Sequence, residues 1–117
     1  MRRLSSVLFA FLLWSTAVPA HTHLVSSVPA DHATVAVAPK EATLTFAEGV
    51  ILTSAKLESP DGSKTELKPL PEGAVKEARL PLPALPAGGY KLQWRATSDD
   101  GHIMTGEIRF VVGAAPK

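Results

Sequence analysis

The sequence has no cysteine in its 117 residues. This absence excludes disulfide bonds, zinc fingers, iron–sulfur clusters, cysteine nucleophiles and copper sites that combine histidine with cysteine. Small exported domains often depend on disulfides for their stability. If this chain is exported, side-chain packing must hold it together, with at most the help of a bound ion.

Basic runs and aromatic residues are also scarce. The chain has no run of Lys and Arg and no patch that interleaves basic with aromatic residues, and aromatic residues make up only 6% of it. Nucleic acid is therefore not an expected partner. No stretch after Ala20 is long and apolar enough to span a bilayer, so we expect a protein that is not embedded in a membrane once it is processed.

Residues 1–20 have the pattern of a secretory signal peptide. Arg2 and Arg3 give a positive start, the segment from Leu4 to Trp14 is almost wholly apolar, and Val18-Pro19-Ala20 offers small residues for cleavage. Cleavage there makes His21 the first residue of the processed chain, whereas an uncleaved segment would act as a membrane anchor. After cleavage, ten Lys and Arg face eleven Asp and Glu, a side-chain net charge of −1.

The remaining chain consists of short apolar and β-branched runs between turn signals, without a helix-period stretch of ten residues. We expect one domain over residues 21–113, followed by a short tail over 114–117. Its predicted strands are Thr22–Val28, Ala42–Glu48, Ile51–Ser59, Lys64–Leu67, Val75–Leu80, Gly89–Ser98 and Ile103–Val112. About seven such strands predict an all-β fold, a single small antiparallel sandwich or Greek-key barrel. The prolines at 81, 83 and 86 make residues 81–88 unsuitable for regular structure.

His21 is the first candidate metal ligand. A free α-amino group beside an imidazole offers two nitrogens from one residue, a chelate that suits copper(II) best. His23 is a further candidate, because residues i and i+2 of a strand share a face. The alternative is that both histidines are polar residues at a loose chain end.

The Asp100-Gly101-His102 sequence is the second candidate. Its simplest interpretation is a hairpin turn, but the glycine between them also lets the carboxylate and the imidazole face one site. With His21 they supply three nitrogens and one oxygen, a set that fits tetragonal copper(II). Zinc could use the same atoms in a tetrahedron, and nickel remains open.

Other residues with metal-binding or charged side chains are weaker candidates. His32 follows a proline and is predicted to lie in a surface turn, while Arg95 could steady Asp100 or be surface charge. Trp94 and Met104 are expected to be core residues. Copper(I) prefers sulfur donors, and Met104 is the only methionine after residue 20, so we expect no separate copper(I) site.

Three blocks of the sequence carry a family resemblance. They are HTHLVSSVPA at 21–30, Ala38-Pro39 with LTFAE at 44–48, and YKLQWR at 90–95 with SDDGH at 98–102 and GEIRF at 106–110. Together they resemble the CopC family of periplasmic copper-resistance and copper-carrier proteins. The resemblance covers essentially the whole processed chain, although a methionine-rich loop found in some members is missing.

The resemblance implies a cupredoxin-like Greek-key β-barrel with one copper(II) ion held by His21, Asp100 and His102. It also implies a periplasmic carrier or buffer that works with an inner-membrane CopD-type protein or with other periplasmic copper proteins. A site closed by four donors argues for a binding protein that is not an enzyme, and we expect this protein to be a monomer. The alternatives are a copper oxygenase acting on polysaccharides, and an Ig-like adhesion module with incidental histidines.

Overall fold

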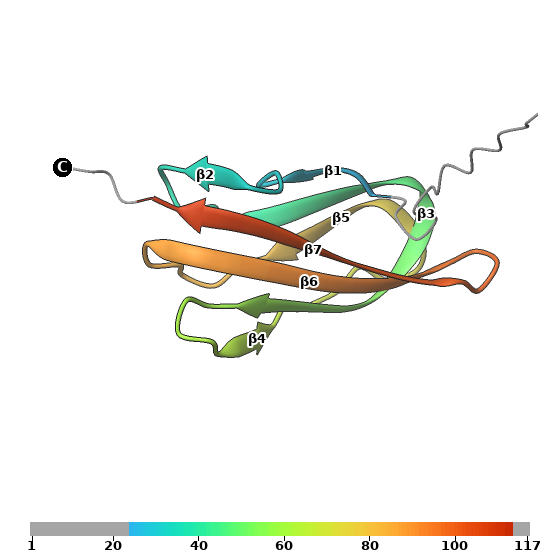
Figure 1. The fold of residues 1–117 in the computed structure, drawn as a ribbon. Helices are drawn as coiled ribbons and strands as arrows, with labels where there is room; N and C mark the ends of the chain where they lie inside the picture. Colours follow the sequence, from blue (N-terminus) through green and yellow to red (C-terminus); the bar gives the residue numbers. More distant parts are fainter. Residues whose placement is uncertain (1–23, 114–117) are drawn as a thin grey trace, which may run out of the picture.

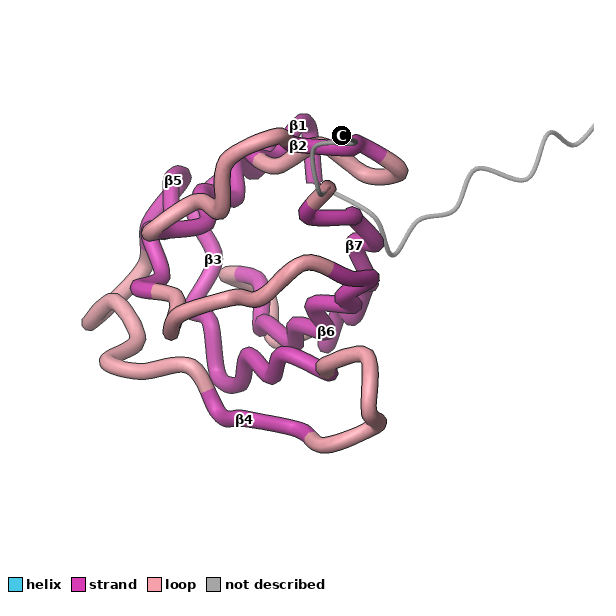
Figure 2. The backbone as a smooth tube through the Cα atoms, turned by 90° about the vertical axis from the view of Figure 1, so that its left-hand side faces the viewer, coloured by secondary structure: helices cyan, strands magenta, loops and turns pink. Residues whose placement is uncertain are grey.

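The computed structural model describes residues 24–113, which form seven β-strands and no helix. Figure 1 shows the strands, and Figure 2 shows them from one end as a ring, which confirms the predicted all-β fold. The strands are β1 (Leu24–Val28), β2 (Ala33–Val35), β3 (Glu41–Glu58), β4 (Lys64–Glu66), β5 (Val75–Pro81), β6 (Gly88–Ser98) and β7 (Ile103–Val112). Within this range no helix could cross a membrane.

The hairpin of β6 and β7 is the most regular part of the sheet. The two strands pair without interruption from Gly88 opposite Val112 to Thr97 opposite Ile103. Side chains at every second position point inward because successive residues of a strand face opposite sides. The predicted inward residues of both strands are buried, namely Tyr90, Leu92, Trp94, Ala96, Ile108, Phe110 and Val112.

Strand β3 connects the two halves of the barrel. The sequence predicts separate strands over Ala42–Glu48 and Ile51–Ser59, but the structure has one strand of 18 residues. The pairing of β3 with β5 shifts register between Thr45 and Val50. Such an irregularity bends a strand without ending it. Where the sequence predicts a break between two strands, the structure therefore has a bend within one strand. Phe46, before the bend, packs edge to face on Trp94 with ring centroids 5.2 Å apart.

Strand β2 was not expected from the sequence. It has only three residues, too few to show a periodic pattern, and it pairs in parallel with β7. The otherwise antiparallel sheet therefore contains one parallel pair. Asp31 and His32 lead into β2: the Arg109 N–H donates to Asp31 Oδ1 over 2.8 Å, and the His32 N–H donates to the Arg109 carbonyl. The predicted surface turn at His32 is confirmed.

Candidate metal centre

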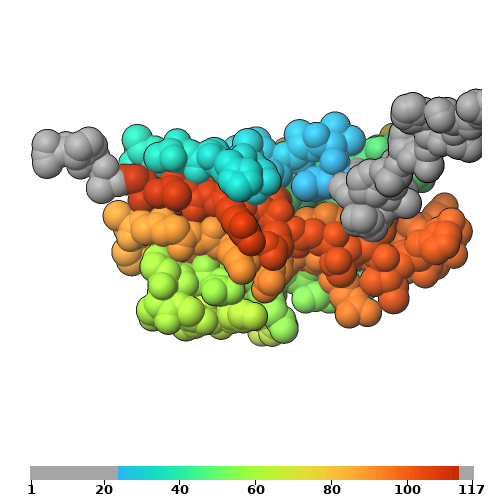
Figure 3. Space-filling view, in the orientation of Figure 1, coloured from blue at the N-terminus to red at the C-terminus, as the bar shows by residue number. Residues whose placement is uncertain are grey.

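The turn between β6 and β7 is closed by backbone hydrogen bonds. The Ser98 N–H donates to the His102 carbonyl over 2.9 Å, and the Gly101 N–H donates to the Ser98 carbonyl over 2.9 Å. Gly101 has a φ of 88°, a backbone conformation that residues other than glycine rarely adopt. The predicted Asp-Gly hairpin turn is therefore present. Figure 3 shows the orange-red turn projecting at one end of the molecule.

Asp100 and His102 contact each other across this turn. His102 Nδ1 lies 3.0 Å from Asp100 Oδ1, and the Ser98 hydroxyl donates to the same oxygen. The hydrogen bond from Ser98 holds the pKa of the Asp100 carboxyl below its usual 3.8; His102 contributes in the same direction, and desolvation opposes it. Both side chains are accessible, with 67% of Asp100 and 78% of His102 exposed.

The pair has two donor atoms to offer a metal. Neither Oδ2 of Asp100 nor Nε2 of His102 is hydrogen-bonded or ion-paired to another group within residues 24–113. While Nδ1 faces the carboxylate, Nε2 points away from it across the ring, so one ion cannot touch both side chains. Binding by both requires their mutual contact to open. Their exposure means that this rotation disturbs no packing.

The pairing pattern puts the start of β1 at the same end of the barrel as this turn. Strand β5 pairs with β3 both at Thr45 and at Val50, so it occupies one edge of β3 through the bend. Strands β1 and β6 therefore share the opposite edge. Leu24 pairs with Phe46, and Ser98 pairs with Val50. Figure 1 agrees: the blue start of β1 and the β6–β7 turn lie toward the same end.

The start of β1 and the end of β6 flank the same stretch of β3 along that edge. Leu24 at the start of β1 pairs with Phe46, and Ser98 at the end of β6 pairs with Val50, so these two ends bound the stretch of β3 between Phe46 and Val50. That stretch contains Glu48, an exposed residue whose carboxylate the sequence analysis did not consider. Only the pairing of β3 on both sides of its bend reveals this arrangement, and no sequence spacing signals it.

The predicted ligands are divided between described and undescribed parts of the chain. The structure brings Asp100 and His102 together. His21 and His23 lie outside the described residues, as do the predicted signal peptide over 1–20 and the tail over 114–117. Within residues 24–113 no three His, Asp or Glu side chains gather as a metal site. Of the described residues, this turn therefore presents the pair Asp100 and His102.

The remaining candidates lie apart from the turn or in the core. Trp94 and Met104 are buried, as predicted. Among the described residues, Arg95 makes no hydrogen bond or ion pair with Asp100. His32 is ion-paired with Asp31 at 3.3 Å on the turn before β2.

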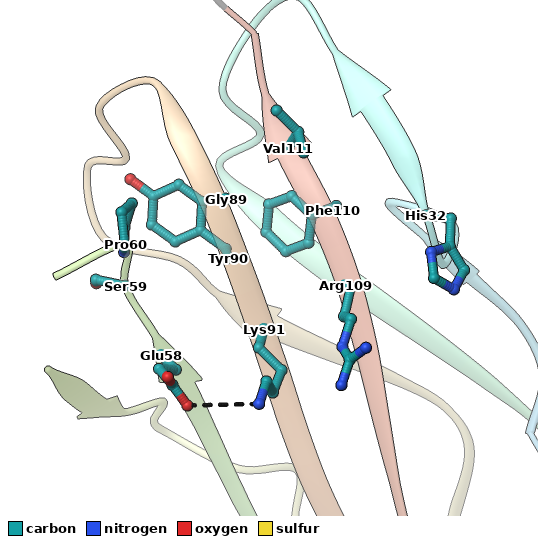
Figure 4. A pocket seen from close by; sticks show the side chains of 10 residues that line it. All are labelled: His32, Glu58, Ser59, Pro60, Gly89, Tyr90, Lys91, Arg109, Phe110 and Val111. Carbon is teal, nitrogen blue, oxygen red and sulfur yellow. Dashed lines mark ion pairs between the residues drawn. The ribbon is translucent and has the colours of Figure 1, made fainter. Parts of the chain in front are cut away.

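His32 also lines a surface cavity of about 400 Å³, shown in Figure 4. There Lys91 Nζ lies 3.8 Å from Glu58 Oε1, and the two side chains form an ion pair. In β3, Glu58 pairs with Lys91, whereas Val50 pairs with Ser98. The cavity is therefore at the other end of β6 from Asp100 and His102.

Ser98 is the residue of this turn that the sequence analysis missed. Its hydroxyl donates to Asp100 and accepts a hydrogen bond of 3.3 Å from the His102 N–H. A serine two residues before the aspartate and four before the histidine is a possible signal, but serine is common in turns, so the spacing alone is weak.

Comparison with known proteins decides the family. The family model described as the CopC domain matches residues 24–113. The chain belongs to the CopC family. It is 36% identical to copper resistance protein C of Pseudomonas syringae pv. tomato, over 88% of this chain and 89% of that protein. It is 37% identical to copper resistance protein C of Escherichia coli, over 80% of this chain and 82% of that protein.

Solved structures of CopC proteins share the fold. CopC from Methylosinus trichosporium OB3b superimposes with a TM-score of 0.67 and 31% identity, over 79% of this chain and 93% of that one. PcoC from E. coli, described as a methionine-rich copper resistance protein, gives a TM-score of 0.60 and 37% identity, over 80% and 99% of the two chains. This chain differs from PcoC in having only two methionines, of which Met104 is buried.

Proposed function

We propose that this CopC protein is a periplasmic copper(II) carrier or buffer in copper resistance or homeostasis, and that it is not an enzyme. One copper(II) ion is held by the amine and imidazole of His21, the carboxylate of Asp100 and the imidazole of His102, with His23 as a further candidate. The observation that carries the proposal is the exposed contact between Asp100 and His102 at the barrel end where the described chain begins.

Chain length supports the participation of His21. Phe46 and Val50, the β3 partners of Leu24 and Ser98, are four residues apart, roughly 13 Å in an extended strand. Residues 21–24 can span at most about 10 Å, and the turn after Ser98 extends from the other side. The gap is therefore within reach of the N-terminal residue of the processed chain.

The donor set supports copper(II) as the cargo. Nitrogen and oxygen donors in a tetragonal arrangement suit copper(II), and the sulfur donors that copper(I) prefers are missing from the exposed turn. A ligand must lose its proton before it binds a metal. The α-amine has an ordinary pKa of about 7.7–8.0, so affinity falls in mild acid. Four donors leave few open positions for substrate chemistry.

Membership of the CopC family supports the proposed location and partner. Removal of residues 1–20 by the export machinery frees the His21 amine and delivers the protein to the periplasm. An inner-membrane CopD-type protein or another periplasmic copper protein then exchanges copper with it. The proposed site uses donors from one chain, which is compatible with the protein acting as a monomer.

The proposal is tested by copper(II) EPR spectroscopy. Processed protein that begins at His21 is compared with the same protein carrying one additional alanine before His21, which converts the amine into a peptide amide. We expect a nitrogen-rich tetragonal signal that changes markedly in the extended protein. Identical signals from the two proteins would refute the N-terminal chelate.

Two substitutions test the other half of the site. Asp100→Asn and His102→Gln each remove a proposed donor from an exposed side chain, and each is expected to weaken copper(II) binding and to alter the EPR signal. His32→Gln is the matched control, because His32 is an exposed histidine in a different turn. Copper binding that is unchanged by both Asp100→Asn and His102→Gln would contradict the proposal.

A further inference from the structure

The Ser98 hydroxyl connects the two proposed ligands of the turn. It donates a hydrogen bond to Asp100 Oδ1 and accepts one of 3.3 Å from the His102 N–H. A serine hydroxyl has one donor and two acceptor positions, so both contacts are made at once. Ser98 itself is held at the end of β6 by its backbone pairing with Val50 and by its N–H bond to the His102 carbonyl.

Packing does little to orient the ligands. The side chains of Asp100 and His102 are largely exposed, so packing against neighbours restricts their rotamers little. Their contact through Oδ1 and Nδ1 has to open if both are to bind one ion, and that contact then no longer orients Asp100. Two described contacts can persist on Asp100 Oδ1, namely the hydrogen bond from the Ser98 hydroxyl and a longer one of 3.5 Å from the His102 N–H. The bond from Ser98 is the shorter of the two.

We infer that Ser98 is a positioning residue for copper(II), an inference that rests on the proposed function. Its hydroxyl occupies Asp100 Oδ1 and thereby leaves Oδ2 as the single oxygen that binds the ion. Its acceptor bond to the His102 N–H keeps the backbone between the two ligands in one conformation. Groups that orient metal ligands in this way typically change metal affinity by about 10–100-fold when they are removed.

The sharpest test uses two substitutions of nearly equal shape. Ser98→Thr keeps the hydroxyl, whereas Ser98→Val replaces it with a methyl group, and both residues favour strands. In processed protein that begins at His21, we expect Ser98→Val to weaken copper(II) binding by about 10–100-fold. Ser98→Thr is expected to bind within about threefold of wild type. Chelator competition measures the affinities.

The matched control is Ser63→Ala. The Ser63 hydroxyl donates to Asp61 Oδ1 over 2.8 Å in the turn between β3 and β4. This turn follows Glu58, at the end of β3 far from Val50, so the substitution removes the same kind of hydrogen bond away from the ligands. Thermal unfolding of the copper-free proteins shows whether Ser98→Val and Ser63→Ala lose similar stability. We expect copper affinity to fall only in Ser98→Val.

EPR separates positioning from a general loss of structure. The parallel hyperfine coupling of copper(II) is expected to change in Ser98→Val and to be restored in Ser98→Thr. Equal affinities and spectra for Ser98→Val and wild type would overturn the inference about Ser98. So would a copper-binding loss of equal size in folded Ser98→Thr and Ser98→Val.

The same series distinguishes this inference from the proposed function. If Asp100→Asn and His102→Gln weaken binding while Ser98→Val does not, only the role of Ser98 fails. If wild type binds no copper(II), or binds it independently of Asp100 and His102, the proposed function fails and the Ser98 inference fails with it.

Discussion

Trp94 on β6 lies directly opposite Gly106 on β7, and its indole ring covers the space that a side chain at residue 106 would fill. A Cβ atom added to Gly106 would lie 2.6 Å from Cζ2 of Trp94, a distance at which atoms collide. The same ring packs edge to face on Phe46 of β3. The glycine therefore allows one large aromatic side chain to connect three strands in the core.

Gly106→Ala is expected to destabilise the protein by about 1–3 kcal/mol, because an added methyl group in a packed core forces its neighbours to move. Urea unfolding measures the loss, and Trp94 fluorescence reports the disturbed ring, since Trp14 is the only other tryptophan and lies in the predicted signal peptide. Gly89→Ala is the control, because nothing lies within 4 Å of its added Cβ. Equal losses in the two variants would contradict this account.

Asp31→Ala is expected to loosen β2. The Asp31 carboxylate accepts a hydrogen bond of 2.8 Å from the Arg109 N–H at the start of the parallel pairing. Its removal should cost about 1.5–3 kcal/mol of unfolding free energy, the range for a hydrogen bond to a charged group. It should also speed hydrogen exchange at the Arg109 amide. Asp31→Asn retains an acceptor oxygen and should lose less, so an equal loss in Asn and Ala would count against this role.

The Asp61 carboxylate is expected to make stability depend on acid pH. Hydrogen bonds from the backbone and hydroxyl of Ser63 hold its pKa below the usual 3.8. A lowered pKa in the folded state means that the unfolded state binds more protons. The stabilisation is therefore present above pH 3.8 and is lost as the pH falls through the lower, folded-state value.

Asp61→Asn removes the titrating group and serves as the comparison. The difference in urea midpoint between wild type and Asp61→Asn should shrink as the pH is lowered below 3.8. Because Asp61 is exposed, the effect is small, and many closely spaced pH values are needed. A difference that grows in acid would show that the sign of the argument is wrong.

Copper(II) is expected to raise the Tm of processed protein that begins at His21. A ligand that binds only the folded state stabilises it by about 2.7 kcal/mol when its free concentration is 100 times its dissociation constant. The shift should be smaller in His102→Gln and in protein with an added residue before His21. Calorimetry with and without copper measures it. A shift of equal size in all three proteins would indicate binding elsewhere.

The regular strands could be predicted from local pattern. In β6, buried residues alternate with polar ones, namely Tyr90, Leu92, Trp94 and Ala96. A sheet with one face toward the core and the other toward solvent is enough to produce that alternation. Two features could not be predicted in this way. Strand β2 has three residues, and the bend of β3 depends on a register shift against β5. Both depend on partners that are distant in the sequence.

For the candidate site, the residue types could be recognised without a structure: histidines beside a predicted cleavage site, and a carboxylate and an imidazole around a turn glycine. Side-chain chemistry and turn preference are local properties, so they can be recognised without a fold. The folded chain was needed to show that β1 begins on the same edge of β3 where β6 ends, and that Ser98 contacts both Asp100 and His102. Strand pairing over long sequence separations determines which chain segments share an edge.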